Sequence, residues 1–356
     1  MTCIFFTPQL ARAQGCIIAH SVGGVGGPLS QGGYLQKGHL ELSLGYRHQY
    51  SFRHFVGDTE QVYRTQGHTE VRNRINLIDA ELTYQITPRW SAVLNVPLEY
   101  ASRRYNIPAY SLGNTVSITG DYGLSGMGDI GLLGQVWIWS PEHATHHNIQ
   151  IGFGIQAPTG RDNIQNRLIL IPGTQPIDST ADYSIQPGIG GWGIPISWQS
   201  FQALGKTTQV YFNGTYLITP QETNGVANVP PPGFPPPAPQ NAYVSIADEY
   251  LLQPGVGYSF VSLRGLTATI GLRDEGVPAH DLIGGDEGFR RPGYAVSLEP
   301  GLQYLFHHGS DLLTANVDRA LYRNRVPSVP DIQLGGKGGD AAFADWVWLA
   351  SFSHRF

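Results

Sequence analysis

Apolar and polar residues alternate along most of this chain, in runs of about a dozen residues separated by turn-forming segments. In the run 74–87, one face carries Ile78, Ala80, Leu82 and Tyr84, and the other carries Asp79, Glu81, Thr83 and Gln85. Successive side chains of a β-strand point to opposite faces, so this period of two predicts strands with one apolar and one polar face. Helical periodicity is nearly absent.

The same reading predicts twelve strands, and the segments between them differ in length in a regular way. Long and short connections alternate along the whole chain, and the last strand carries the alternating aromatic residues of the C-terminus. The predicted strands are 39–50, 74–87, 90–101, 128–139, 148–158, 185–201, 207–218, 247–260, 265–274, 292–306, 311–323 and 344–356.

This arrangement is typical of an all-β, transmembrane, antiparallel up-and-down β-barrel. Bacterial outer-membrane barrels have an even number of strands, short turns on the periplasmic side and long loops outside. Closure pairs every backbone group, which the bilayer core requires. Strand-end aromatics such as Trp90, Tyr100 and Trp139 are expected at the two water interfaces. The sequence therefore predicts a protein of the bacterial outer membrane.

The strand 185–201 is the weakest of the twelve. Pro187 and Pro195 cannot donate to a strand ladder, and four glycines between them loosen the register. The strand count becomes ten or fourteen if this segment is not a strand or if 105–118 pairs with another part of the chain.

Composition narrows the class further. Charged residues make up 14% of the chain, aromatic residues 11%, and glycine occurs 45 times, which does not fit intrinsic disorder. No run approaches 18 apolar residues, which excludes a helical membrane protein. The formal net charge is −5 without a basic run, so nucleic acid is not an expected partner.

The two ends of the chain carry sorting signals. Residues 1–13 are interpreted as the residual part of a signal peptide, 14–38 as a periplasmic segment and 39–356 as the barrel. Whether Cys16 is lipidated stays open. The terminal Phe356 closes an alternating strand, which predicts recognition by the barrel-assembly machinery. Outer-membrane lipid and lipopolysaccharide are the other expected partners.

Charged and amide side chains fall mostly on the polar face of the strands, which faces the lumen. They either line a wet channel, where charged rings set selectivity, or pair across a narrow interior and fill it. A row of Gln186, Gln253 and Glu299 at one level is a further possibility. The candidates for lining the lumen are Arg47, Asp79, Glu81, Glu99, Gln156, Gln253, Arg273, Glu299 and Asp318.

No pattern of catalytic residues stands out, so no enzymatic activity, cofactor or metal site is predicted. A Gly-x-Ser-x-Gly elbow, a P-loop and a His-Glu-x-x-His motif are all absent. Histidines 143, 146, 147, 307 and 308 are expected on solvated turns. Acidic residues of 274–288 are expected on an outer loop, where they are either solvated or bridged by divalent cations to lipopolysaccharide. The Pro-rich run 230–239 predicts a stiff spacer or partial lid.

Short glycine-rich motifs resemble one bacterial family. The stretches SGMGDI (125–130) and NIQIGFGIQAPTG (148–160), and the repeated Gln/Glu-Pro-Gly, are similar to a family labelled as putative outer-membrane proteins of the meta-pathway of phenol degradation. This resemblance implies a barrel that passes small, partly aromatic compounds. We expect passive passage of such solutes through the lumen. The alternative is a non-transporting surface barrel whose long loops bind a partner or extracellular matrix.

Overall fold

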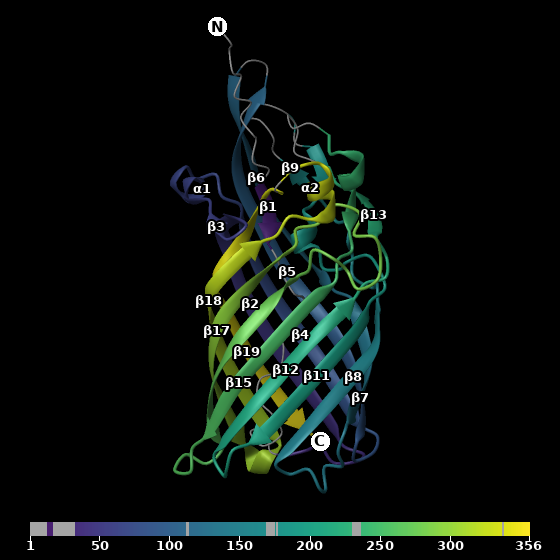
Figure 1. Cartoon of the computed structure of the whole chain (residues 1–356), viewed down its shortest axis with the longest axis vertical. Helices are drawn as coiled ribbons and strands as arrows, with labels where there is room; N and C mark the ends of the chain where they lie inside the picture. The colour runs from purple at the N-terminus through teal and green to yellow at the C-terminus, as the bar shows by residue number, and fades with distance from the viewer. Residues whose placement is uncertain are drawn as a thin grey trace.

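Twelve antiparallel strands close into one barrel in the computed structural model, with the last strand paired to the first strand of the ring (Figure 1). The structure describes residues 13–16, 33–111, 114–168, 175, 177–229, 236–336 and 338–356. The expected signal segment up to residue 12 and the proline-rich residues 230–235 lie outside the described residues. The all-β fold class predicted from the sequence is confirmed.

The ring follows chain order, and each strand pairs with its neighbours in sequence. Its strands are β2 (Leu40–Val56), β4 (Arg72–Gln85), β5 (Trp90–Ser111), β7 (Ile130–Trp137), β8 (His147–Ala157), β11 (Ile194–Ala203), β12 (Thr208–Ile218), β15 (Glu249–Ser259), β16 (Leu266–Val277), β17 (Gly293–Phe306), β18 (Asp311–Arg325) and β19 (Asp340–Arg355).

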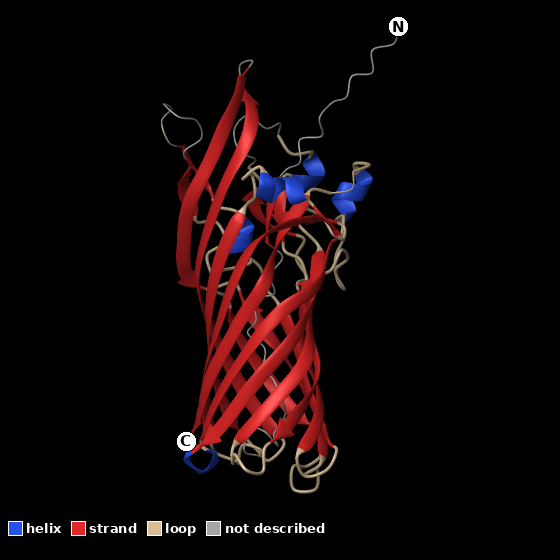
Figure 2. Cartoon of the chain, turned by 90° about the vertical axis from the view of Figure 1, so that its left-hand side faces the viewer, coloured by secondary structure: helices blue, strands red, loops and turns tan. Residues whose placement is uncertain are grey.

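The remaining elements lie mainly at the long-loop end of the barrel (Figure 2). We call this end upper and the opposite, short-turn end lower. The minor elements are the strands β1 (Ala13–Cys16), β3 (Thr59–Glu60), β6 (Asn114–Met127), β9 (Gln165–Leu168), β10 (Ile177–Thr180), β13 (Thr223–Ala227) and β14 (Tyr243–Ser245), the helices α1 (Val62–Gln66) and α2 (Val329–Gln333), and the 3₁₀ turns η1 (Tyr183–Ile185), η2 (Pro239–Asn241) and η3 (His307–Gly309).

The predicted alternation sorts side chains between the two faces of the wall. Ile78, Leu82 and Phe153 point outward with 45%, 39% and 70% of their surface exposed, whereas Arg47 and Glu299 point inward and are fully buried. The strand-end aromatics Trp90, Tyr100 and Trp139 also face outward. A closed wall with an apolar outer band and aromatic borders is the form that spans a bacterial outer membrane, which is where this protein resides.

Two charged side chains that break the sorting are paired locally. Arg319 points outward, where its guanidinium lies 4.7 Å from the Trp346 ring centroid and 3.6 Å from the Asp345 carboxylate. His354 hydrogen-bonds through Nδ1 to Asp311 at the lower rim, at 2.5 Å. His354 lies at the end of β19, whereas Arg319 lies in the middle of β18.

The predicted strand 185–201 was wrong over its first half, because β11 begins only at Ile194. Pro187 has no backbone N–H to donate, and Gly190 adopts a positive φ of 82°, which a regular strand does not accept. The segment before β11 instead folds against the inside of the barrel, and Pro187 and Ile189 line its cavity.

The connection 102–127 forms a long hairpin rather than a loop, so the pairing left open for 105–118 is present, within the connection itself and without adding strands to the ring. β5 continues to Ser111, well past the barrel rim, and β6 pairs back along it from Asn114 to Met127. The lower part of β5 pairs with β7, so β6 and β7 follow one another along the same side of β5. The hairpin rises above the rim in both views (Figures 1 and 2).

The N-terminal strand β1 pairs in parallel with Asp340–Ala342 at the upper end of β19. Residues Gly33 to Leu35 line the lower lumen, ahead of β2. The boundaries proposed at residues 13 and 38, and the lipidation of Cys16, stay predictions.

Candidate functional site

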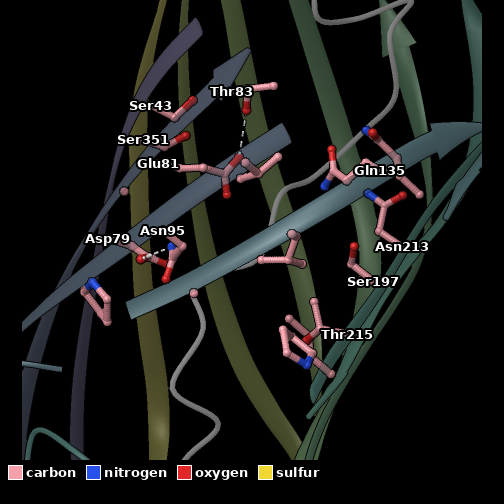
Figure 3. Close-up of a pocket in the computed structure, with 18 of the residues that line it drawn as sticks. Ser43, Asp79, Glu81, Thr83, Asn95, Gln135, Ser197, Asn213, Thr215 and Ser351 are labelled. Atoms are coloured by element: carbon pink, nitrogen blue, oxygen red, sulfur yellow. Dashed lines mark hydrogen bonds between the residues drawn. The ribbon is translucent and has the colours of Figure 1, made fainter. Parts of the chain in front are cut away.

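The lower half of the lumen holds a cavity of about 430 Å³. It extends from the lower rim, at Gln85 and Arg355, to the middle of the barrel, at Glu99 and Gln253. Side chains project into it from both sides of the ring (Figure 3). Because the period of two sends every second residue inward, the cavity is lined by alternate positions of most strands.

One wall of the cavity is polar and acidic. Asp79 and Glu81 are successive inward positions of β4, and Asn95 of β5 donates to the Asp79 carboxylate at 2.5 Å. Thr83 lies 3.5 Å from Glu81. Figure 3 shows these groups facing Gln135, Ser197 and Asn213 across the lumen. This lining can hydrogen-bond water or the polar groups of a solute.

Apolar side chains complete the lining. They are not gathered on one strand but are interspersed with the polar ones, so the cavity offers both kinds of surface to a bound molecule. The main apolar contributors are Leu77, Val93, Leu133, Trp137, Leu251 and Leu312.

A buried ion network lies in the lumen above the cavity, on the side of the ring from β16 to β2. Arg47 on β2 forms a bidentate pair with Glu275 on β16, at 2.5 and 2.8 Å. Three strands lie between β2 and β16 in the ring, so this pair spans the interior. Arg273 also binds Glu275, at 2.8 Å. All three residues are at least nine-tenths buried.

Two more carboxylates surround Arg273. Its guanidinium lies 3.6 Å from Asp318 and 3.9 Å from Glu299, and Gln253 donates to both Glu299 oxygens at 3.1 Å. Mutual attraction repays the desolvation of such groups only when the geometry is good, and removing one partner leaves an uncompensated buried charge. The network is therefore a firm obstruction rather than a loose ring of charges.

Glycines make room for this packing. A Cβ at Gly255 would lie 2.3 Å from the Tyr211 ring, and one at Gly301 would lie 2.2 Å from the Asn316 amide. Both glycines follow a proline in the repeated Gln/Glu-Pro-Gly pattern. The repeat thus leaves interior space for inward side chains of neighbouring strands.

The two motifs that carried the family resemblance meet in the wall. Asp129, in the break between β6 and β7, accepts the N–H of Gly160 through Oδ1 and the N–H of Ile189 through Oδ2, both at 2.8 Å. Thr159 donates to the Gly128 carbonyl at 3.0 Å and accepts the Ile130 N–H at 2.9 Å. These side-chain contacts replace a strand ladder and hold the inward segment before β11.

A second buried cluster joins the upper loops. Asp182 binds Arg291 at 2.5 and 2.8 Å and Arg103 at 3.2 Å. Burial by itself would raise the pKa of the Asp182 carboxyl, but the two guanidinium groups outweigh it and hold the pKa well below its usual value. Arg291 also stacks on Tyr183, with 4.5 Å between guanidinium carbon and ring centroid. The loop that precedes β11 is thereby fastened to the hairpin and to the loop before β17.

All nine candidates predicted from the sequence point inward, in two groups. Asp79, Glu81, Glu99, Gln156 and Gln253 line the cavity. Arg47, Arg273, Glu299 and Asp318 lie in or against the ion network above it. Their role in selectivity stays a prediction.

The proposed row of three residues was wrong in one member. Gln253 and Glu299 are bonded to each other, but Gln186 binds the backbone of Ile164 and Ala181 in the upper loops. Gln186 precedes the start of β11 at Ile194, so it belongs to no strand and does not share the level of the other two residues.

The sequence analysis did not identify Tyr34 and Asp129 as residues of the site, and it placed Glu275 wrongly. Glu275 was assigned to an outer loop, whereas β16 continues to Val277 and turns Glu275 into the lumen. The period of two, extended by one step past Arg273, would have found it. Tyr34 carried no such signal, because it lies outside any strand. Asp129 stood in the motif SGMGDI and in the predicted strand 128–139, but β7 begins only at Ile130, so its bridging role was not foreseen.

No metal-binding group was found among the residues that the structure describes. The turn histidine His307 contacts Asp311, and the loop carboxylate Asp286 accepts the backbone N–H of Asp281 at 2.7 Å. Within the same residues, no helix has the length and apolarity needed to cross a bilayer.

Comparison with solved structures supports the fold. An outer-membrane channel from Pseudomonas putida F1 superposes with a TM-score of 0.56 and 13% sequence identity, over 90% of this chain and 97% of that chain. The P. putida toluene transporter TodX (TM-score 0.47, 9% identity, 97% and 96% coverage) and the Ralstonia pickettii toluene transporter TbuX (0.46, 11%, 98% and 99%) are less similar, so the argument rests on the first.

At this level of identity the likeness shows a shared barrel fold. No protein-family model and no curated protein matches the chain.

Proposed function

We propose that this protein is a channel for passive passage of small molecules of partly aromatic or hydrophobic character across the outer membrane. The observation that carries the proposal is the lumenal cavity of about 430 Å³, which is large enough for a small organic solute. The label of the phenol-degradation family, and the outer-membrane channel among the similar structures, agree with this proposal.

The mixed lining favours uncharged amphipathic solutes over anions. Six carboxylates line the cavity, and Arg355 is the sole basic residue among its described lining. Anionic solutes would be repelled by this lining, and leucine and tryptophan side chains offer contact to an uncharged ring. A neutral molecule with one polar group fits both kinds of surface.

Passage requires rearrangement of the closed upper lumen. The Arg47–Glu275 pair crosses the interior, and the Asp182 cluster fastens the loops above it. We infer that the upper loops and this ion network together form the gate. The lower cavity is then a solute-binding site on the periplasmic side of the gate.

Planar-bilayer conductance and liposome uptake of uncharged aromatic solutes test the proposal. Wild type is expected to pass little current, and Arg47→Ser to pass severalfold more, because the variant removes the side chain that spans the lumen. Arg319→Ser is the matched control, since Arg319 points outward. Equal conductance of wild type and both variants, with no solute uptake by any of them, would contradict a channel.

The long hairpin β5–β6 favours a second candidate, a surface barrel that binds a partner without transport. The hairpin projects beyond the barrel rim, and its base contacts the upper loops through Arg103 and Gly123. Deleting residues 105–119 would abolish such binding and leave the barrel folded. A channel function predicts instead that this deletion leaves conductance of the Arg47→Ser variant unchanged.

A further inference from the structure

The segment ahead of the first barrel strand places an aromatic side chain in the lower mouth of the cavity. Tyr34 lines the cavity although it precedes β2. The Gly33 carbonyl accepts from Arg355 at 3.1 Å, and the Gly38 N–H donates to the Gln85 carbonyl at 2.7 Å. Residues 33–38 are therefore tied to the inner rim on both sides of Tyr34.

The pocket around Tyr34 contacts both the hydroxyl and the ring of this phenol side chain. Its hydroxyl donates to the Ala144 carbonyl at 2.6 Å and accepts from Asn148 Nδ2 at 3.1 Å. Its ring meets Trp137 edge-on, with 5.0 Å between centroids and planes at 90°, and Phe201 lies at 6.3 Å. Edge-to-face contacts of this kind are favourable between aromatic rings.

The donor in this pocket is held in place independently of Tyr34. The Asn148 Oδ1 accepts the N–H groups of Trp139 and Ile149 at 3.1 and 2.9 Å, and Nδ2 donates to the Trp139 carbonyl at 2.9 Å. These bonds fix the amide, so its second N–H points at the ring site whatever occupies it. Asn148 is only 1% exposed, and a buried donor without a partner is costly.

The two rings of the pocket depart from the rule that sorts aromatics outward. Trp137 and Phe201 face inward and are 6% and 4% exposed, whereas the neighbouring Trp139 faces outward at 45%. Trp137 and Phe201 cannot act as membrane-interface anchors from inside the barrel. Their inward position calls for an apolar partner in the lumen, and Tyr34 is the group found there.

We propose that Ala144, Asn148, Trp137 and Phe201 form a binding subsite for phenols, and that Tyr34 occupies it as an internal substitute that has to leave before a phenolic solute enters. This inference rests on the proposed function, for which it specifies the solute class. The side chain of tyrosine, cut at Cβ, is 4-methylphenol, which makes that molecule the natural probe.

The protonation state follows from the surroundings of Tyr34. Burial raises the pKa of its hydroxyl, and the hydrogen bond from Asn148 acts against this effect. The hydroxyl stays protonated at neutral pH and can donate to the Ala144 carbonyl. The subsite therefore selects the neutral phenol, because a phenolate has no proton to give.

Calorimetric titration of the purified full chain with 4-methylphenol tests the subsite. Tyr34→Ala is expected to bind roughly tenfold more tightly than wild type, since the pocket is vacated. Tyr34→Phe keeps the ring in place and is expected to bind as weakly as wild type. Tyr84→Ala, at an outward tyrosine of the same lower end, is the matched control.

A matched ligand tests the hydroxyl contact. 4-Methylanisole has a methyl group in place of the hydroxyl proton, so it leaves the Ala144 carbonyl without a donor. It is expected to bind Tyr34→Ala about tenfold more weakly than 4-methylphenol. Should Tyr34→Ala not fold, wild type with millimolar 4-methylphenol is expected to show a change in tryptophan emission that Trp137→Phe lacks.

The outcomes separate this proposal from the one above. Equal affinity of Tyr34→Ala and Tyr84→Ala for 4-methylphenol, or equal affinity of Tyr34→Ala for both ligands, overturns the subsite. Absence of the emission change in wild type overturns it by the second route. Tight binding without any conductance or uptake would instead overturn the channel and leave the subsite standing.

Discussion

Arg273 shows how a single side chain organises the interior of this barrel. Its guanidinium is 1% exposed and lies within 4 Å of Glu275, Glu299 and Asp318, so it offsets three carboxylates from three different strands. With Arg47, the network has two guanidinium groups against three carboxyl groups. Arg273 is the arginine that contacts all three carboxyl groups, whereas Arg47 contacts Glu275.

The variant Arg273→Met is expected to lower the free energy of unfolding by about 3–5 kcal/mol, because it leaves buried carboxylates uncompensated. Urea unfolding in lipid vesicles measures the change. Arg104→Gln is the control: the Arg104–Asp121 pair is exposed, with its charged atoms 3.7 Å apart, and such pairs contribute about 1 kcal/mol or less. Similar losses of unfolding free energy for both variants would contradict the stabilising role of Arg273 in the network.

Asp182 predicts how the upper loops respond to acid. Its folded pKa is lowered, although burial opposes the shift, because Arg103 and Arg291 favour the charged carboxylate. A carboxyl with a depressed folded pKa stabilises the fold above its unfolded pKa, near 3.9, and loses this effect as pH falls through the folded value. Protease cleavage within 177–193 is therefore expected to be constant from pH 8 to about pH 5 and to rise only below about pH 4.

The Asp182→Asn variant checks the assignment. It removes the titrating group, so the acid-dependent rise in cleavage should disappear and the rate should be high at every pH. An unchanged acid profile in this variant would assign the response to another group.

At the scale of elements, the wall is interrupted where β6 gives way to β7. Asp129 bridges the break by accepting the N–H groups of Gly160 and Ile189. Gly160 and Gly188 touch, since a Cβ at Gly188 would lie 2.5 Å from the Gly160 backbone. The inward segment before β11 is thus held at its centre by this carboxylate and by close backbone packing, and further by backbone hydrogen bonds of Gly188 and Gly193.

Asp129→Ala is expected to free this segment, because two hydrogen bonds to a charged acceptor are lost, each worth about 1.5–3 kcal/mol. Hydrogen exchange at residues 186–193 should rise by at least roughly tenfold, while exchange in β16 and β17 stays the same. Asp121→Ala, at an exposed carboxylate of the hairpin, serves as the control. Protection of 186–193 that survives in Asp129→Ala would contradict the bridging role.

The strand order was predictable from the sequence because the period of two and the alternation of long and short connections are local signals. They placed the ring from β2 to β19, including its short lower turns. They failed at Ile194 and along 102–127, where glycine, proline and polar residues allow either a loop or a strand. There, contacts with distant parts of the chain decide the structure, such as those made by Asp129.

At the scale of the whole molecule, the barrel separates an apolar exterior from a polar lumen. Adjacent residues of β4 lie in opposite environments: Leu82 faces the membrane, and Thr83 lines the cavity. The sorting is therefore testable by two adjacent substitutions.

Leu82→Arg is expected to destabilise the barrel by about 2–4 kcal/mol, because it places a charge in lipid. Thr83→Arg should cost about 1 kcal/mol or less, since the new guanidinium would lie in the cavity beside Glu81. Urea unfolding in vesicles measures both. Equal costs would contradict the inside–outside assignment.

The candidate site was only partly predictable. The inward register of Asp79, Glu81 and Arg273 followed from alternation, because that register fixes the face of every residue in a strand. Which inward residues lie around open space and which pack into the ion network depends on distances across the lumen, and sequence alone does not contain them. Tyr34 lies outside any strand, so its place against Trp137 and Phe201 required the structure. Recognition of Phe356 by the assembly machinery stays a prediction.

The seam between β2 and β19 has a consequence for the order in which this protein is made. Glu41 meets Arg355, and the Phe356 N–H donates to the Leu40 carbonyl at 2.9 Å, so the ring is joined by residues more than three hundred positions apart. A ribosome finishes the first of these partners long before it begins the second. Contacts at such sequence separation form late and slowly. Until this seam pairs, the open sheet has two unpaired edges, and some other molecule has to shield them.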